Sequence, residues 1–270
     1  MRRILTAAVM APVALAAVFL LAPQPFFAVV LVAMELVAVE IVTMGRRWTR
    51  GPLWAIYPLS AACGLALSWP VLASRVPAHG DLAAAALGLA VGSGAALLVL
   101  LARTPFEDVV PAVGLIGFSS LYVGVPIAAV VRVQAADPWL LFLLLAIVWL
   151  GDTAAYYVGT RFGRSLLAPR VSPRKTWEGA LANLLTAVGA AVACCLWRLD
   201  GIDWLIVGMA SLASVAGQLG DLAQSQFKRA AGVKDSGTFL PGHGGAWDRL
   251  DALLVAAPVW WLGLALLERL

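Results

Sequence analysis

The fold is decided by apolar stretches such as the one that spans residues 139–160, WLLFLLLAIVWLGDTAAYYVGT. This stretch contains one charged residue, Asp152, and a helix of its length would cross about 30 Å of hydrocarbon. In lipid, a helix satisfies all of its own backbone hydrogen-bonding groups, which an irregular segment cannot do. The stretch therefore predicts a transmembrane helix.

Eight further apolar stretches of similar length set the fold class. They span residues 4–21, 26–44, 53–73, 82–102, 109–131, 178–197, 202–222 and 252–267. Hydrophobic residues make up 62% of the chain and charged residues 13%, whereas soluble domains have about 45–50% and about 25%. We therefore expect an all-α, polytopic membrane protein of about nine transmembrane helices.

The chain has no long polar segment that could build a separate soluble domain, so we expect one integral membrane unit. Residues 1–131 would supply the N-terminal transmembrane helices, and residues 132–270 a C-terminal transmembrane region with the long polar loops. The first apolar stretch follows Met1-Arg2-Arg3 and is as long as a membrane span. We interpret it as the first transmembrane helix, with a secretory signal peptide as the alternative.

Lysine and arginine residues gather in alternate loops, which predicts the orientation, because cytosolic loops carry the excess of these residues. With a cytosolic N-terminus, only four of the 19 would lie outside: Arg75, Arg132, Arg198 and Arg269. We therefore expect the N-terminus in the cytosol and the C-terminus outside, in the inner (plasma) membrane. The two long polar loops, residues 161–177 and 223–247, would then carry a site that faces the cytosol.

Four aspartates lie near this cytosolic boundary, in or beside apolar stretches. They are Asp152, Asp221, Asp248 and Asp251. Charged residues in such places are costly and mostly functional. Hard cations such as Mg²⁺ prefer oxygen ligands and often bind beside phosphates. The four acids therefore suggest a metal site, and the alternative is that each one pairs with a nearby arginine.

A basic, glycine-rich segment lies between Asp221 and Asp248. Glycine lets a backbone approach a phosphate closely, and Lys and Arg supply the opposite charge. If the eighth helix continues past the membrane, Asp221, Ser225 and Lys228 share one of its faces. His243 has two interpretations, a general acid or base, or a turn residue that contacts phosphate.

The loop at residues 161–177 ends in a second polar motif. Ser172 is expected to be a helix N-cap, and basic residues beside a helix N-terminus suit an anionic ligand. Anchoring at the membrane surface is the alternative for Arg170 and Arg174. Glu35 and Glu40, in the second apolar stretch, are expected to be structural partners of an arginine rather than catalytic.

Residues 225–251, SQFKRAAGVKDSGTFLPGHGGAWDRLD, resemble the signature of the phosphatidate cytidylyltransferase family, also called CDP-diglyceride synthases. Two further segments are similar to family segments, DTAAY at residues 152–156 and SPRKTWEG at 172–179. The resemblance covers about the C-terminal half of the chain. Ala246 departs from the family, which usually has a larger aliphatic residue there, and this should affect packing more than chemistry.

The resemblance implies a Mg²⁺-dependent nucleotidyltransferase that joins CTP to phosphatidate and forms CDP-diacylglycerol and pyrophosphate in phospholipid biosynthesis. Together with the residue pattern, it predicts as catalytic Asp221, Lys228, Arg229, His243, Asp248 and Asp251. It predicts as substrate-binding Ser172, Lys175, Thr176, Glu178, Ser225, Lys234, Asp235, Gly244, Gly245 and Arg249. The predicted metal ligands are Asp152, Asp221, Asp248 and Asp251, and a second cation, which could be monovalent, is an open alternative.

The expected partners are CTP, phosphatidic acid and membrane lipid, with no nucleic acid, and a homodimer is left open. Two other classes of function compete with this one. The first is a related lipid enzyme, such as a CTP-dependent polyprenol or phytol kinase or a synthase that acts on ether lipids. The second is a transporter, but a transporter should carry its charges near the bilayer midplane rather than at one face.

Overall fold

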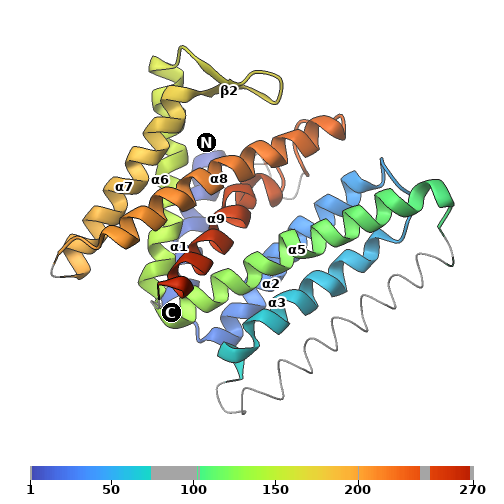
Figure 1. The fold of residues 1–270 in the computed structure, drawn as a ribbon, viewed down its shortest axis with the longest axis horizontal. Coiled ribbons are helices and arrows are strands. Elements are labelled where there is room, and N and C mark those ends of the chain that lie inside the picture. The colour runs from blue at the N-terminus through green and yellow to red at the C-terminus, as the bar shows by residue number, and fades with distance from the viewer. Residues whose placement is uncertain (1, 74–101, 103, 200, 238–243, 268–270) are drawn as a thin grey trace. The chain divides into compact units, whose positions relative to one another are not determined.

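The computed structural model describes residues 2–73, 102, 104–199, 201–237 and 244–267 (Figure 1). Within these residues, seven helical segments are long and apolar enough to cross a membrane. They are Pro23–Gly45, Leu53–Leu72, Phe106–Ala136, Pro138–Phe162, Trp177–Arg198, Trp204–Ala230 and Trp247–Leu266. The chain is thus an all-α polytopic membrane protein, as predicted. The span expected over residues 82–102 lies outside the described residues, apart from residue 102.

The chain forms two compact units, and the first consists of Met1–Ala135 with Ala231–Arg249. Its helices are α1 (Arg2–Leu20), α2 (Pro23–Gly45), the 3-10 helix η1 (Leu53–Ala55), α3 (Ile56–Leu72) and α5 (Phe106–Ala136). The apolar part of α1, Met10–Leu20, is too short to count as a full membrane span. α2 packs against both α1 and α3.

Polar side chains near the end of α5 secure the first unit. Gln134 donates from Nε2 to the carbonyl oxygens of Val18, at 3.1 Å, and Leu21, at 2.9 Å. Arg132 donates from a guanidinium nitrogen to the carbonyl oxygen of Leu67 at 3.2 Å. The last carbonyls of a helix have no partner within that helix, so the two bonds from Gln134 satisfy acceptors at the end of α1 that would otherwise need water.

The second unit consists of Ala136–Ala230 and Leu250–Leu270. It contains α6 (Pro138–Phe162), β1 (Leu166–Ala168), β2 (Ser172–Thr176), α7 (Trp177–Arg198), α8 (Trp204–Ala230) and most of α9 (Trp247–Leu266). α6 packs along α7, and α7 along α8. At one end of the pair, Arg198 forms an ion pair with Asp137 at 3.6 Å, and the rings of Trp139 and Trp197 meet edge to face.

The loop between α6 and α7 is a β-hairpin, which the sequence did not predict. β1 and β2 pair antiparallel, with Leu166 opposite Thr176 and Ala168 opposite Ser172. The expected N-cap at Ser172 is therefore wrong, because Ser172 lies at the start of β2. The N-cap of α7 is Thr176, whose hydroxyl accepts from the N–H of Gly179 at 3.2 Å.

α8 continues well beyond the expected apolar stretch and ends at Ala230. The helix therefore continues past the expected membrane span, as the shared face required. Asp221, Ser225 and Lys228 follow one another at helical spacing and lie on one face of α8. Lys228 and Arg229 occupy the last turn. Positive side chains there are favourable, because the C-terminal end of a helix carries partial negative charge.

The corrected N-cap gives a stability prediction. Thr176→Val removes the hydroxyl that accepts from Gly179 and should lower the free energy of unfolding by about 1 kcal/mol. Ser172→Ala is the matched control, and it should change stability by less than about 0.5 kcal/mol. Thermal unfolding of the detergent-purified variants, followed by circular dichroism, measures both. An equal or larger loss in Ser172→Ala would contradict the assignment.

Candidate functional site

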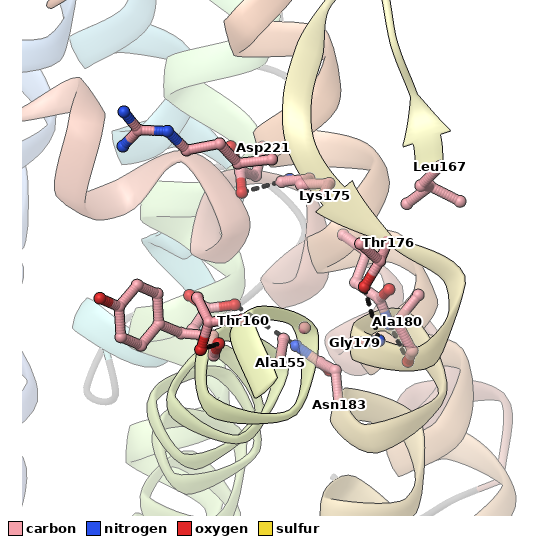
Figure 2. Close-up of a pocket in the computed structure, with 14 residues that line it drawn as sticks. Ala155, Thr160, Leu167, Lys175, Thr176, Gly179, Ala180, Asn183 and Asp221 are labelled. Atoms are coloured by element: carbon pink, nitrogen blue, oxygen red, sulfur yellow. Dashed lines mark hydrogen bonds and ion pairs between the residues drawn. The ribbon is translucent and has the colours of Figure 1, made fainter. Parts of the chain in front are cut away.

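A cavity of about 310 Å³ lies within the second unit, between α6, the hairpin, α7 and α8 (Figure 2). This volume lies at the lower end of the range for small-molecule sites, about 300–1,000 Å³. Its polar lining residues are Asp152, Tyr156, Thr160, Arg174, Lys175, Thr176, Asn183, Gln218 and Asp221. Four of the predicted site residues, Asp152, Lys175, Thr176 and Asp221, therefore share one cavity.

Acidic and basic side chains meet directly in this cavity. Lys175 on β2 forms an ion pair with Asp221 on α8 (Figure 2). The two side chains are 26% and 32% exposed, and ion pairs with such access to solvent add little to stability. Arg174, from the same strand, also lines the cavity. β2 thus brings positive charge opposite the aspartates of the helices, and an anionic ligand could use it.

Asp152 is held by a chain of hydrogen bonds that crosses three helices. Asn183 on α7 donates from Nδ2 to Oδ1 of Asp152 at 3.3 Å. The hydroxyl of Ser214 on α8 donates in turn to Oδ1 of Asn183 at 2.8 Å. Asn183 and Ser214 are both buried. The Asn183 amide is thereby oriented with its NH₂ group toward the carboxylate.

Glycines let the helices approach closely enough to make these contacts. A Cβ at Gly151 would lie 2.7 Å from Oδ1 of Asn183, and one at Gly179 would lie 2.8 Å from the carbonyl oxygen of Ala155. Both distances are shorter than a Cβ can approach a non-bonded atom, so a side chain at either position would push the helices apart. Small residues at such crossings are usual between membrane helices, where they allow backbones to pack tightly. Gly151 therefore places Asn183 beside the following residue, Asp152.

Two predicted residues at the start of α7, Thr176 and Glu178, make hydrogen bonds that stabilise the hairpin and the helix. Glu178 accepts from the N–H of Ser165 with both carboxylate oxygens, at 3.3 and 3.4 Å, and it does not line the cavity. Thr176 lines the cavity and caps α7. The substrate-binding role predicted for Ser172, Thr176 and Glu178 stays a prediction, and these contacts define a structural role for the last two.

The ends of α8 and α9 bring further predicted residues into the second unit. The carboxylate of Asp251 interacts electrostatically with Asp221 and Lys228, and its Oδ1 accepts from the N–H of Ala252 at 2.8 Å. Ser225 is buried on α8. Arg229 is exposed and donates from Nε to the carbonyl oxygen of Val171, in the hairpin, at 3.5 Å.

The remaining predicted residues belong to the first unit. Oδ2 of Asp248 accepts from the N–H groups of Ser236, at 2.9 Å, and Gly245, at 3.0 Å. Gly244 has a positive φ of 80°, which glycine adopts without strain. Lys234, Asp235 and Arg249 are exposed. His243 lies outside the described residues.

The partners of Glu35 and Glu40 correct a further expectation. Glu40 accepts hydrogen bonds from the Ser236 hydroxyl and from the N–H groups of Ala246 and Trp247. Glu35 accepts from the hydroxyl of Ser60 at 2.7 Å. Among the residues whose side chains the structure describes, hydroxyl and backbone donors reach these carboxylates and no arginine pairs with either, so the expected arginine partner is not found there.

Three of the four predicted metal ligands, Asp152, Asp221 and Asp251, belong to the second unit, and Asp248 belongs to the first. Among the residues that the structure describes, no three His, Cys, Asp or Glu side chains form a group ready to hold a metal ion. The metal site therefore stays a prediction. Carboxylate oxygens of the kind that Asp152 and Asp221 bring to the cavity are the ligands that Mg²⁺ prefers.

Sequence reasoning missed the amides of Asn183 and Gln218, although a signal for Gln218 was present. Gln218 and Ser214 precede Asp221, Ser225 and Lys228 at helical spacing, so one polar face runs along most of α8. Gln218 donates from Nε2 to the carbonyl oxygen of Ala180 at 3.4 Å. Asn183 is a single amide in an apolar helix, and only the packing of α6 against α7 gives it a partner.

Comparisons with known proteins give matches along the chain. The model of the Cytidylyltransferase family matches residues 1–267. A protein of Brucella suis named phosphatidate cytidylyltransferase is 47% identical over 120 residues, which are 44% of this chain and 44% of that protein. Proteins of the same name from Haemophilus influenzae and Mycobacterium tuberculosis are 46% identical over 126 residues and 35% identical over 140 residues.

The matched parts cover 44% of this chain and of the Haemophilus protein, and 52% of this chain and 42% of the Mycobacterium protein. In each comparison the chain thus matches less than half the length of the curated relative.

Proposed function

The chain belongs to the cytidylyltransferase family, and we propose that it is a Mg²⁺-dependent enzyme that joins CTP to phosphatidate. An oxygen of the phosphatidate phosphate attacks the α-phosphorus of CTP and forms a new P–O bond. The bond from that phosphorus to the bridging oxygen breaks, and pyrophosphate leaves with the electron pair. The products are CDP-diacylglycerol and pyrophosphate.

The observation that carries this proposal is the mixed charge of the cavity in the second unit. Lys175 and Arg174 supply positive charge from β2, where an anionic triphosphate or lipid phosphate can use it. Transfer of this kind depends mainly on positioning and on electrostatic stabilisation of the reacting phosphates. A phosphate nucleophile carries its negative charge already, so the chain needs no strong general base.

The acids of the same unit suit the metal that this chemistry uses. Asp152 and Asp221 face the cavity, and they would hold Mg²⁺ there, with Asp251 near Asp221. When bound, Mg²⁺ would neutralise charge on the triphosphate and on the leaving pyrophosphate. Asn183 keeps Asp152 in place, and Lys175 balances the charge of Asp221. Asp248, in the first unit, remains a further candidate ligand.

We also propose nine spans with the N-terminus in the cytosol and the C-terminus outside, in the plasma membrane of the cell. The positive loops support this orientation, because the hairpin and the end of α8 hold most of the basic residues of the second unit. Arg229 contacts Val171, so these two segments lie at the same end of that unit. CTP would then arrive from the cytosol and the lipid from the inner leaflet.

The reaction class can be tested with CTP labelled at the α-phosphate. Purified protein with phosphatidic acid and Mg²⁺ should move the label into the lipid fraction, one for one with the pyrophosphate formed. A CTP-dependent kinase transfers the γ-phosphate instead and leaves all the label in soluble CDP. Recovery of the label in CDP, with phosphate on a lipid acceptor, would replace the proposal with the kinase.

Two aspartates, Asp203 just before α8 and Asp221 in its C-terminal half, give a matched test of the cavity. Asp221→Asn removes the charge that faces Lys175, and turnover should fall about 100- to 1,000-fold, as when an electrostatic stabiliser is lost. Asp203 accepts from the N–H groups of Leu205 and Ile206 at the start of α8, and Asn can cap in the same way. Asp203→Asn should therefore keep its turnover. Near-normal turnover of Asp221→Asn at limiting Mg²⁺ would argue against the metal assignment.

The orientation can be tested with single cysteines in a background without Cys63, Cys194 and Cys195. Arg170→Cys places a thiol in the exposed hairpin, and Gly201→Cys places one in the exposed loop between α7 and α8. In intact cells a membrane-impermeant maleimide should label the thiol at position 201 and spare the one at 170. Labelling of position 170 alone would reverse the orientation.

A further inference from the structure

Glu40 is a buried carboxylate in the apolar helix α2, with only 6% of the residue exposed. Its Oε2 accepts from the Ser236 hydroxyl at 2.6 Å and from the N–H of Trp247 at 3.0 Å, and its Oε1 accepts from the N–H of Ala246 at 2.7 Å. Burial of a carboxylate is costly unless hydrogen bonds compensate it. Three donors on two oxygens provide that compensation.

All three donors come from the glycine-rich part of the signature, about two hundred residues later in the chain. The N–H groups of Ala246 and Trp247 lie at the start of α9, where the first N–H groups have no partner within the helix. Glu40 thus caps α9 from another helix. A carboxylate is favourable there, because the N-terminal end of a helix carries partial positive charge.

A second carboxylate completes the same arrangement. Asp248, one residue after Trp247, accepts from the N–H groups of Ser236 and Gly245. Ser236 is therefore bonded to both acids, through its hydroxyl to Glu40 and through its N–H to Asp248. The position of the Asp248 carboxylate follows from the start of α9, and Glu40 fixes that start.

Two glycines leave the space that Glu40 occupies. A Cβ at Gly237 would lie 2.6 Å from Oε1 of Glu40, and a Cβ at Gly245 would overlap both of its carboxylate oxygens. Trp247 is anchored as well, since its indole N–H donates to the hydroxyl of Tyr122 on α5 at 3.3 Å. These glycines therefore serve the approach of an acid from α2, whether or not they also approach a phosphate.

We propose that Glu40 is a positioning residue, which sets the place of Asp248 by capping α9 and tying Ser236 to its first residues. The consequence for turnover rests on the proposed function, but the consequence for the backbone does not. Loss of the Glu40 carboxylate frees the N–H groups of Ala246 and Trp247, and Asp248 moves with them.

Hydrogen–deuterium exchange of the full-length protein tests the backbone part. Glu40→Gln keeps the size of the side chain but turns an amide NH₂ toward N–H donors. The amides of residues 245–247 should exchange about 10- to 100-fold faster than in the unchanged protein. Glu35→Gln is the matched control on the same helix, because Glu35 bonds Ser60 and not the signature, and it should leave these amides protected. Unchanged protection in Glu40→Gln would overturn the proposal.

Kinetics test whether the positioning matters for the reaction. Glu40→Gln should lower kcat about 10- to 100-fold, since small displacements of reacting groups cost this much. The KM for CTP should stay within about twofold, and Glu40→Asp should recover part of kcat. Faster exchange with unchanged kcat would reduce Glu40 to a structural role and overturn the positioning claim.

Two results separate this proposal from the proposed function. If the unchanged protein does not use CTP, the function fails, and the exchange measurement alone still decides whether Glu40 positions Asp248. If Glu40→Gln does not fold, Glu40→Asp takes its place, since it keeps the charge but shortens the side chain that reaches the three donors. In this variant the amides of residues 246 and 247 should exchange faster than in the unchanged protein, and unchanged exchange would overturn the proposal.

Discussion

A carboxylate or amide inside an apolar helix is stable only where hydrogen-bond donors or opposite charges reach it. The polar contacts of both units follow from this constraint. In the first unit, Glu40 draws the Ser236 hydroxyl and two backbone N–H groups onto α2. In the second, Asp152 is reached by the amide of Asn183 and Asp221 by the ammonium of Lys175. Each acid thus fixes a segment that is remote in the sequence.

Close packing of helices makes such contacts geometrically feasible. Asn183 can reach Asp152 because residue 151 has no side chain, and α7 can approach α6 because residue 179 has none. The same relation holds between Gly245 and Glu40. In a membrane protein, hydrophobic burial gives little preference for one helix pairing over another, so backbone approach and interhelical hydrogen bonds select the arrangement. The glycines beside the acids are therefore part of the site's architecture.

The signature segment contributes to both units in different ways. Its first part, the end of α8, extends the polar face that also carries Gln218 and Asp221, and it reaches the hairpin through Arg229. Its last part is shaped by two acids, Glu40 and Asp248, which accept from its backbone. A phosphate-binding loop needs free N–H groups, and in this loop those of Ser236, Gly245, Ala246 and Trp247 already have carboxylate partners. Ligand contacts would thus come from its other groups and from basic side chains.

The sequence by itself determined the all-α membrane fold, the polar loops and the family, because lipid imposes a length and polarity on each span and the signature lies within one continuous segment. It also identified Asp152, Lys175, Thr176 and Asp221, which the cavity brings together. Only the tertiary structure decided the hairpin, the N-cap at Thr176 and the partners of Glu40 and Asn183. The partners of Glu40 and Asn183 lie 206 and 31 positions away, and local sequence patterns carry no information about such pairs. The hairpin and the N-cap are local, but strands as short as β1 and β2 show no hydrophobic alternation that predicts them.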